Sequence, residues 1–313
     1  MQLGMIGLGR MGANMAERVR RGGHTIVGYD VSADSGRDVA TLEELVAALT
    51  PPRAVWIMVP LQFVGPTVET LAGLLGEGDV VVDGGNSRWS DDKERAGLLA
   101  ERGVGFVDCG VSGGIWGLDN GYALMCGGSA DDVARLRPVF DALRPEGGSG
   151  FVHAGPVGAG HFTKMVHNGI EYGMMQALAE GYELLTAAEL VEDPDACVRS
   201  WRKGTVIQSW LLDLLARSFD DDPRLEQIDD YAEDSGEGRW TVEAAVDNAV
   251  PISTISAALF ARFASRQHES VAMKAVAAMR NQFGGHAIHR ADGTVSEPVR
   301  RPDGTTVPPR SRD

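Results

Sequence analysis

The first thirty residues constrain the fold most, because an apolar segment leads directly into a glycine-rich turn and then into a helical pattern. Residues 2–6 read as a strand, the hexad 7–12 (GLGRMG) as the turn and residues 11–20 as the helix. A second apolar strand follows at 25–29. The chain therefore begins as a strand–turn–helix–strand unit, which is the building block of α/β proteins.

The same alternation continues through the first half of the chain. Strands that alternate with helices imply βαβ units, so we predict a Rossmann-type, doubly wound parallel sheet with helices on both faces. The further segments that carry this prediction are strands at 54–59, 79–83, 104–108 and near 122–126, and a helix at 131–143.

After Gly160 the pattern changes to helical spacing, and no proline occurs until beyond residue 190, which predicts one long helix over about 161–190. An all-α C-terminal part is therefore expected. We predict a Rossmann domain over 1–158, an all-helical domain over 159–290 and an extended or disordered tail over 291–313. The remaining helices are predicted at 195–203, 206–218, 240–249, 252–266 and 270–283.

Charge and cysteine content exclude several classes of protein. The 313 residues carry 29 Lys and Arg against 44 Asp and Glu, a formal net charge of −15, which repels nucleic acid and acidic membrane surfaces. The N-terminus reads as a strand rather than a leader and no apolar run is long enough to span a membrane, so a cytoplasmic protein is expected. The cysteines Cys109, Cys126 and Cys197 lack metal-ligand spacing, and we expect neither a disulfide framework nor a metal.

The hexad 7–12 is a candidate dinucleotide site. In this context a G-x-G-x-x-G sequence presents backbone amides and a helix N-terminus to a pyrophosphate. Asp30 ends the second strand, where a carboxylate accepts hydrogen bonds from a ribose 2′-hydroxyl and repels a 2′-phosphate, which favours NAD over NADP. Positions after the third and fourth strands would border the nicotinamide. The predicted cofactor-binding residues are Gly7, Leu8, Gly9, Arg10, Met11, Gly12, Asp30, Val59, Pro60 and Asn86.

Four hydrogen-bonding residues share one face of the predicted long helix. Lys164, His167, Asn168 and Glu171 stand at positions i, i+3, i+4 and i+7. By spacing alone, a solvated helix face explains them as well as a catalytic site does. The apolar runs on either side and the preceding dinucleotide domain favour the catalytic interpretation.

With these motifs in place, the sequence resembles the decarboxylating 6-phosphogluconate dehydrogenases. The segment 164–173 (KMVHNGIEYG) is similar to the signature of that family. The likeness runs over roughly residues 1–290, and the chain, being much shorter than the long form, resembles the short bacterial class. Its further motifs are, in order, 83–87 (DGGNS), 111–114 (VSGG), 121–128 (GYALMCGG), 236–241 (GEGRWT), 260–262 (FAR) and 280–286 (RNQFGGH).

The resemblance implies a reaction and its catalytic residues. The protein would convert 6-phosphogluconate to ribulose 5-phosphate and CO2, with hydride transfer to NAD, in the pentose phosphate pathway. Lys164 would take the C3 hydroxyl proton and later donate to the carbonyl oxygen, and Glu171 would protonate C1 of the enediol. Lys164 must then be neutral at the working pH, which requires desolvation or a nearby cation.

The resemblance also implies how a phosphorylated sugar acid is held by a helical substrate and dimerisation domain. The second subunit of the family inserts its Arg and His into the active site, so a homodimer or higher homo-oligomer is expected. These cations would offset the negative charge locally. The implied substrate residues are Asn86, Ser112, Gly113, Gly114, His167 and Asn168 at the acid end, Tyr172, Arg239 and Arg262 at the phosphate, and Arg280 and His286 from the partner.

Two departures and two alternatives accompany this interpretation. NADP-using members carry Asn-Arg-Thr where this chain has 31–33 (VSA), although Arg37 could meet a phosphate and NADP stays open. Arg239 stands where lysine is more usual. A related β-hydroxyacid dehydrogenase of the 3-hydroxyisobutyrate type would share Lys164 but act on an unphosphorylated 3-hydroxy acid. A nucleotide-sensing regulatory protein would keep the fold without turnover.

Overall fold

The computed structural model describes residues 1–284 and 286–295. Within these residues the chain divides into two compact units. The first is formed by Met1–Glu226 and Asp234–Leu259, and the second by Gln227–Glu233 and the residues from Phe260 onward. The boundaries predicted at residues 158 and 290 stay predictions, and most of the predicted tail at 291–313 lies outside the described residues.

The first unit contains a seven-stranded sheet in the order β2-β1-β3-β4-β5-β6-β7. The pairs within β1 to β5 are parallel, which is what short connections through helices produce. The strands are β1 (Gln2–Ile6), β2 (Thr25–Tyr29), β3 (Ala54–Ile57), β4 (Val80–Asp83), β5 (Gly105–Ser112), β6 (Ala123–Gly128) and β7 (Phe151–Gly155).

Helices cover both faces of this sheet, because its central strands are apolar on both sides. Met15 of α1 and Phe140 of α6 pack against one face, and Val68 of α3 and Leu99 of α4 against the other. This arrangement confirms the predicted fold class. The elements are α1 (Arg10–Arg21), η1 (Ala33–Ser35), α2 (Leu42–Ala48), α3 (Leu61–Leu74), α4 (Asp92–Ala100), η2 (Gly114–Trp116), α5 (Gly117–Asn120) and α6 (Ala130–Leu143).

The sheet differs from the prediction at its far edge. The strand predicted near 122–126 is β6, and it runs antiparallel to β5 rather than parallel. The edge strand β7 was not predicted, because its pattern is weakly apolar and its three central residues are exposed. An edge strand needs only one neighbour, so its sequence carries less of the buried-strand pattern.

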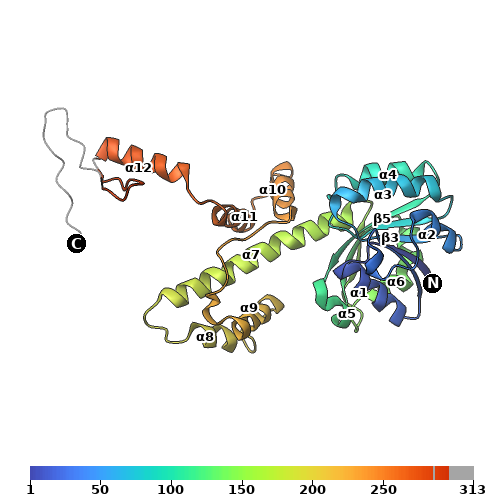
Figure 1. Cartoon of the computed structure of the whole chain (residues 1–313), viewed down its shortest axis with the longest axis horizontal. Helices are drawn as coiled ribbons and strands as arrows, with labels where there is room; N and C mark the ends of the chain where they lie inside the picture. The colour runs from blue at the N-terminus through green and yellow to red at the C-terminus, as the bar shows by residue number, and fades with distance from the viewer. Residues whose placement is uncertain (285, 296–313) are drawn as a thin grey trace. The chain divides into compact units, whose positions relative to one another are not determined.

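The 29-residue helix α7 (Ala159–Ala187) leaves the sheet and forms the axis of the helical part of the first unit (Figure 1). Its far end packs through Tyr182 against Val198 of α8 and Phe219 of α9. The predicted helices are present, with ends that shift by up to a few residues. They are α8 (Pro194–Ser200), α9 (Trp210–Asp221), α10 (Glu237–Asp247), α11 (Ser253–Ser265) and α12 (Val271–Gly284), with η3 (Pro223–Leu225).

The second unit contains the end of α11 and the whole of α12. The guanidinium of Arg262 donates to the carbonyl oxygen of Glu233 at 2.8 Å, and Asn281 donates to the carbonyl oxygen of His286 at 2.8 Å. None of the helices described here is long and apolar enough to cross a membrane.

Candidate active site

A cavity of about 1300 Å³ lies in the first unit, where the carboxyl ends of β1, β3, β4 and β5 meet the first turns of α7. Parallel sheets bind ligands at this edge, because the connections that follow the strands leave a crevice there. The cavity is lined by the glycine turn, by the segments after β3, β4 and β5, by one face of α7 and by residues of α9 and α10.

The glycine turn forms one wall of the cavity. Gly7 has φ of +92°, and its amide donates to the carbonyl oxygen of Tyr29 at 2.8 Å. A Cβ at Gly12 would clash with the carbonyl oxygen of Gly7, so only glycine allows the helix to start so close to the strand. No acidic residue stands in the first turn of α1. The predicted cofactor residues that line the cavity are Gly9, Arg10, Met11, Gly12, Val59, Pro60 and Asn86.

Asp30 lies behind this wall, where it supports the turn. Its Oδ2 accepts from the amide of Leu8 at 2.7 Å, and its Oδ1 accepts from the amide of Ser32 at 2.8 Å. Arg37 donates to the carbonyl oxygen of Asp30 at 3.0 Å. Gly7, Leu8 and Asp30 therefore shape the turn and do not line the cavity itself.

The four predicted catalytic residues of α7 all line the cavity. The Nζ of Lys164 donates to Oδ1 of Asn168 at 2.7 Å, and Nδ1 of His167 lies 3.0 Å from the same oxygen. That nitrogen also lies 3.8 Å from Oε2 of Glu171. Helical spacing thus places the predicted base, the predicted acid and two polar groups in the wall of one cavity.

Burial changes the acidity of Lys164. It lowers the pKa of the ammonium from its ordinary value, and the negative charges of Glu171 and Glu237 oppose that decrease. The side chain is half-buried because α7 packs directly onto β5, where a Cβ at Gly110 would collide with the side chain of Lys164. Close packing of helix on strand is therefore what desolvates the candidate base.

Buried charges hold the start of α7 against the sheet. Asp108 of β5 accepts from the amide of Gly158 at 2.7 Å and from the amide of His161 at 2.8 Å. This carboxylate caps the helix from a distant strand, where negative charge is favourable. Lys164 follows one turn later, so the cap also determines where the candidate base stands.

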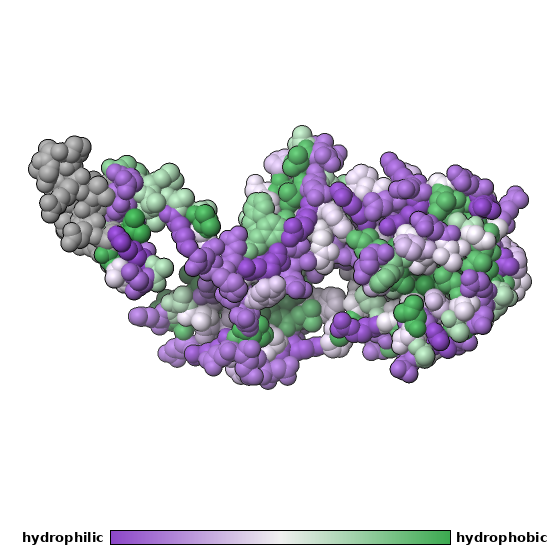
Figure 2. All heavy atoms as spheres, turned by 45° about the horizontal axis from the view of Figure 1, so that its top comes forward, coloured by the Kyte–Doolittle hydropathy of each residue, from purple (hydrophilic) through white to green (hydrophobic). Residues whose placement is uncertain are grey.

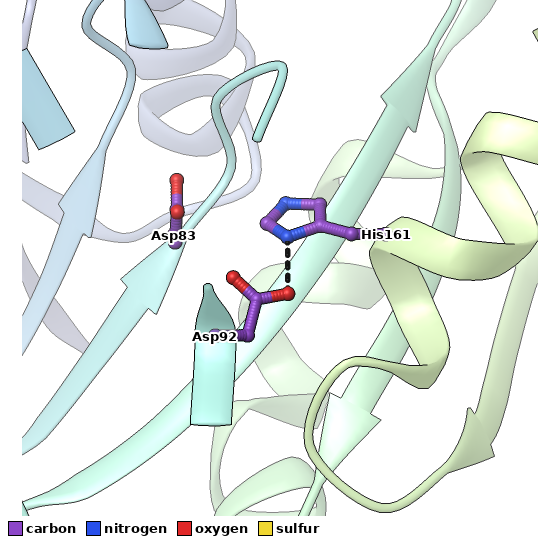
Figure 3. A group of neighbouring side chains, drawn as sticks. All are labelled: Asp83, Asp92 and His161. Atoms are coloured by element: carbon purple, nitrogen blue, oxygen red, sulfur yellow. Dashed lines mark hydrogen bonds and ion pairs between the residues drawn. The ribbon is translucent and has the colours of Figure 1, made fainter. Parts of the chain in front are cut away.

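His161 makes a second anchor for α7 (Figure 3). Its Nδ1 lies 2.8 Å from Oδ2 of Asp92, and both side chains are buried. Burial alone lowers the pKa of His161, but the hydrogen bond and charge of Asp92, with the charges of Asp83 and Asp108, raise it to about 9. Burial raises the pKa of Asp92 to about 6, against the effect of His161. The pair is therefore charged near neutral pH.

Asp83, Asp92 and His161 stand close enough to hold a metal ion (Figure 3). Arg95 already supplies positive charge to this group, because its guanidinium lies 3.2 Å from Asp83 and 3.3 Å from Asp92. A divalent ion would have to displace that guanidinium from a site where it is itself largely buried. We therefore assign the group as an ion-pair network, and the prediction that no metal takes part stays a prediction.

The predicted substrate residues fall into three groups. Asn86, Ser112, Gly113, Gly114, His167 and Asn168 line the cavity. Tyr172 is buried, and its hydroxyl accepts from the amide of Ser235 at 3.1 Å, whereas Arg239 makes two hydrogen bonds to Asp234 at 2.8 and 2.9 Å. The remaining three cations, Arg262, Arg280 and His286, belong to the second unit.

Several residues of the site were not predicted. Glu237 lines the cavity and contacts Asn168, and its motif at 236–241 marks the family resemblance without indicating this role. His161 lies three residues, or about one helical turn, before Lys164. It therefore stands on the same side of the helix as the four predicted catalytic residues, and that spacing is the signal that could have identified it. Trp116 and Trp210 also line the cavity, but a lone aromatic residue carries no sequence signal for that role.

The glycine turn of a Rossmann-type sheet and a helix face that carries a lysine line the same cavity. This combination defines an oxidoreductase with a nicotinamide-nucleotide domain. Residues 2–146 and 160–282 match the family models described as the NAD binding domain and the C-terminal domain of 6-phosphogluconate dehydrogenase. The chain belongs to the 6-phosphogluconate dehydrogenase family, which confirms the resemblance seen in the sequence.

Particular relatives agree with this assignment. A Haloferax volcanii protein named 6-phosphogluconate dehydrogenase, NAD(+)-dependent, decarboxylating, is 39% identical over 302 residues, covering 93% of this chain and 100% of that protein. The structure of Plasmodium falciparum 6-phosphogluconate dehydrogenase matches with a TM-score of 0.77 at 28% identity, over 91% of this chain and 65% of that one. A 3-hydroxyisobutyrate dehydrogenase from Salmonella typhimurium has a TM-score of 0.67 at 22% identity, over 83% of this chain and 92% of that one, and so shares the fold.

Proposed function

We propose that this protein oxidatively decarboxylates 6-phosphogluconate to ribulose 5-phosphate and CO2, with NAD as the hydride acceptor. The observation that carries the proposal is one cavity lined both by the glycine turn after β1 and by the polar face of α7. A dinucleotide on the turn and a sugar acid on the helix would meet there. The Haloferax volcanii relative carries this activity in its name.

The residues of the turn fit a dinucleotide. The first turn of α1 holds no carboxylate, and its N-cap residue Gly9 has no side chain to occupy the free amides, so they suit a pyrophosphate. The carboxylate of Asp30 next to the turn supports the choice of NAD, since it disfavours a 2′-phosphate. The Plasmodium falciparum enzyme was solved with its cofactor NADP+, so the preference needs a direct measurement.

Lys164 is the proposed base. A nicotinamide ring held beside the turn would supply the acceptor for the hydride that leaves C3 of the sugar acid. Lys164 takes the C3 hydroxyl proton as the hydride leaves, which its lowered pKa favours. The resulting 3-keto acid loses CO2, because the carbonyl group accepts the electrons of the breaking bond. Protonated Lys164 then donates to the carbonyl oxygen as that oxygen gains charge.

Glu171 is the proposed acid. It stands two helical turns beyond Lys164, lines the same cavity and is only partly exposed. It would protonate the carbon that lost CO2, which is C1 of the enediol and of the product. Asn86, Ser112, Gly113 and Gly114 would hold the acid end of the substrate on the opposite wall of the cavity.

Arg239 would bind the phosphate end of the substrate. Arg239 is paired with Asp234, so a phosphate would have to share or replace that carboxylate as its partner. Tyr172, Arg262, Arg280 and His286 would complete the phosphate site, the last two from a second subunit. Apolar side chains exposed along α12, visible in green in Figure 2, support such a homodimer, because interfaces cover surfaces of this kind.

Initial rates of nicotinamide reduction test the proposal. The purified protein is given 6-phosphogluconate with NAD and, in parallel, with NADP, and CO2 release is followed in the same samples. We expect a faster rate with NAD, and one CO2 per reduced cofactor. Reduction with 3-hydroxyisobutyrate but not with 6-phosphogluconate would instead establish the unphosphorylated alternative, and no reduction with either would favour a sensing protein.

A further inference from the structure

Glu237 is a buried carboxylate in the wall of the cavity. It is the first residue of α10, its relative exposure is 4%, and it lines the cavity beside the polar face of α7. Its Oε1 accepts from Nδ2 of Asn168 at 2.7 Å. Its Oε2 is buried and has no hydrogen-bond partner among the described residues. A buried carboxylate oxygen without a partner is costly, unless a ligand supplies the missing donor.

Helix α10 holds this carboxylate firmly in place. The hydroxyl of Thr241, one turn after Glu237, donates to the carbonyl oxygens of Met165 at 2.9 Å and of Glu237 at 2.7 Å. The same threonine packs against Gly169 of α7. The position of Glu237 therefore follows from the packing of one helix on the other and not from a mobile loop.

The contact with Glu237 also orients the amide of Asn168. Oε1 of Glu237 accepts from Nδ2 of Asn168, so the amide presents its nitrogen to Glu237 and its oxygen to the other side. That oxygen accepts the hydrogen bond from Nζ of Lys164 at 2.7 Å. A chain of two hydrogen bonds thus runs from Glu237 through Asn168 to the proposed base.

We propose that Glu237 is a substrate-binding and positioning residue: Oε1 orients Asn168 toward Lys164, and Oε2 accepts a hydrogen bond from a hydroxyl group of the bound polyol acid. This inference deepens the proposed function and rests on it for the identity of the substrate. A hydroxyl is the ligand group that fits, because an anionic group would be repelled by the carboxylate, whereas a hydroxyl donor pairs with it. An unhydroxylated acid would leave this oxygen without a partner.

The charge of Glu237 also bears on Lys164. The groups that face Lys164 are His167, Asn168 and Glu171 on its own helix and Glu237 from α10, while β5 contributes the glycine backbone at Gly110. Glu171 and Glu237 are the negative charges among them, and each raises the pKa of Lys164 against the effect of burial. Neutralising Glu237 should therefore lower that pKa further.

The test compares Glu237→Gln with Glu243→Gln. The glutamine side chain has the same shape as the glutamate, and its oxygen can still accept the hydrogen bond from Nδ2 of Asn168. It presents an NH2 group in place of the second carboxylate oxygen. Glu243 lies on the same helix with an exposed side chain paired to Arg88, and so is a matched control for loss of one carboxylate. Thermal melting and NADH binding confirm that each variant is folded.

The first measurement is affinity for two probes by calorimetry, 6-phosphogluconate and 7-phosphonoheptanoate, a phosphonate that matches it in length and carries the same two acidic groups but has no hydroxyl. We expect Glu237→Gln to weaken binding of 6-phosphogluconate by about tenfold or more, the loss of one hydrogen bond to a charged group, and not to weaken binding of the phosphonate. Plain charge repulsion predicts the opposite sign, tighter binding of both probes. That result, or unchanged affinity for 6-phosphogluconate, would overturn the hydroxyl contact.

The second measurement needs no substrate. The sequence has four lysines, Lys93, Lys164, Lys203 and Lys274, so NMR of protein labelled at lysine Cε can follow each one, with assignment by Lys→Arg variants. We expect Glu237→Gln, but not Glu243→Gln, to lower the titration midpoint of Lys164. An unchanged midpoint would overturn the link to Lys164. Failure of wild-type protein to bind or turn over 6-phosphogluconate would instead reject the proposed function, and the titration would still decide this link.

Discussion

At the scale of single residues, Lys164 combines two properties that rarely occur together. It is held in place by a hydrogen bond to Asn168, and it is buried enough for its pKa to fall. A base must be positioned and also unprotonated for part of the time, and an exposed lysine meets neither condition. Removing this side chain should therefore affect chemistry far more than binding.

We expect Lys164→Met to reduce the rate of nicotinamide reduction by at least about 100-fold, the lower end of what a general base contributes. Binding of NADH, measured by fluorescence, should stay close to that of wild type, because Lys164 is not part of the glycine turn. Lys203→Met, which removes an exposed lysine, serves as the control. A variant at position 164 that kept wild-type rates would rule out Lys164 as the base.

Asp30 should determine the choice of dinucleotide. Asp30→Ala removes the carboxylate that would meet the ribose hydroxyl, so the ratio of kcat/KM for NAD over that for NADP should fall by about tenfold or more. Asp30 also supports the turn through Leu8 and Ser32, and Asp30→Asn keeps the shape if the alanine variant is unstable. Asp34→Ala, a nearby exposed change, is the control. An unchanged ratio would contradict the ribose contact.

At the scale of elements, α7 depends on groups from other parts of the chain. Asp108 of β5 caps its first turn, and Asp92 of α4 pairs with His161 one turn before Lys164, the first of the predicted catalytic residues. Buried charged pairs stabilise a structure only while both partners keep their charge, and losing one partner is expensive. The position of the catalytic face should therefore depend on pH through this pair.

The free energy of unfolding should report the charge of His161. Its folded pKa of about 9 lies above its ordinary value of 6.5, so its contribution is complete below 6.5 and is lost as the pH rises through about 9. Asp92, whose pKa is raised to about 6, changes its charge at lower pH and is already ionised at pH 7. Urea unfolding at pH 7 and pH 9.5 measures the loss.

The variant His161→Gln isolates this contribution. At pH 7 we expect it to be less stable than wild type by about 3 kcal/mol, the usual cost of breaking a buried pair, and the difference should shrink by pH 9.5. His153→Gln, on the edge strand β7, controls for histidine titration elsewhere in the protein. A difference that stays constant between the two pH values would contradict a folded pKa of about 9 for His161.

At the scale of the whole molecule, the net charge of −15 has to be reconciled with the anionic substrate that we propose. The predicted phosphate cations are divided between the two compact units, with Arg239 in the first and Arg262, Arg280 and His286 in the second. Arg280 is exposed on α12, whose apolar side chains are also exposed. In the proposed function, Arg280 and His286 come from a second copy of the chain.

Mixed dimers test that arrangement. Arg280→Ala should raise the KM for 6-phosphogluconate by about tenfold or more, as expected for loss of a charged contact, with little effect on NADH binding. If subunits exchange this residue, mixing Arg280→Ala with Lys164→Met should restore activity, since one of the two sites then has both groups. Arg290→Ala serves as the control. Mixtures with no more activity than their components would place Arg280 and Lys164 of one chain in the same site.

Much of the fold and of the site follows from short-range patterns. The strand–turn–helix at residues 2–20, the doubly wound sheet and the face shared by Lys164, His167, Asn168 and Glu171 are all visible in the spacing of residues. Two features are not visible in that spacing: the antiparallel direction of β6 and the edge strand β7. The direction of a strand is decided by the strand it pairs with, and an exposed edge strand lacks the apolar pattern of a buried one.

By itself, the sequence determined which residues stand together on a helix or a turn, because 3.6-residue and 2-residue periods depend only on local geometry. Only the tertiary structure decided which groups meet across elements. Glu237 reaches Asn168, and Asp92 reaches His161, each across 69 residues of chain. Such pairs produce no periodic pattern of residues in the sequence. They form because packing buries polar groups, and buried polar groups require partners wherever the fold brings them.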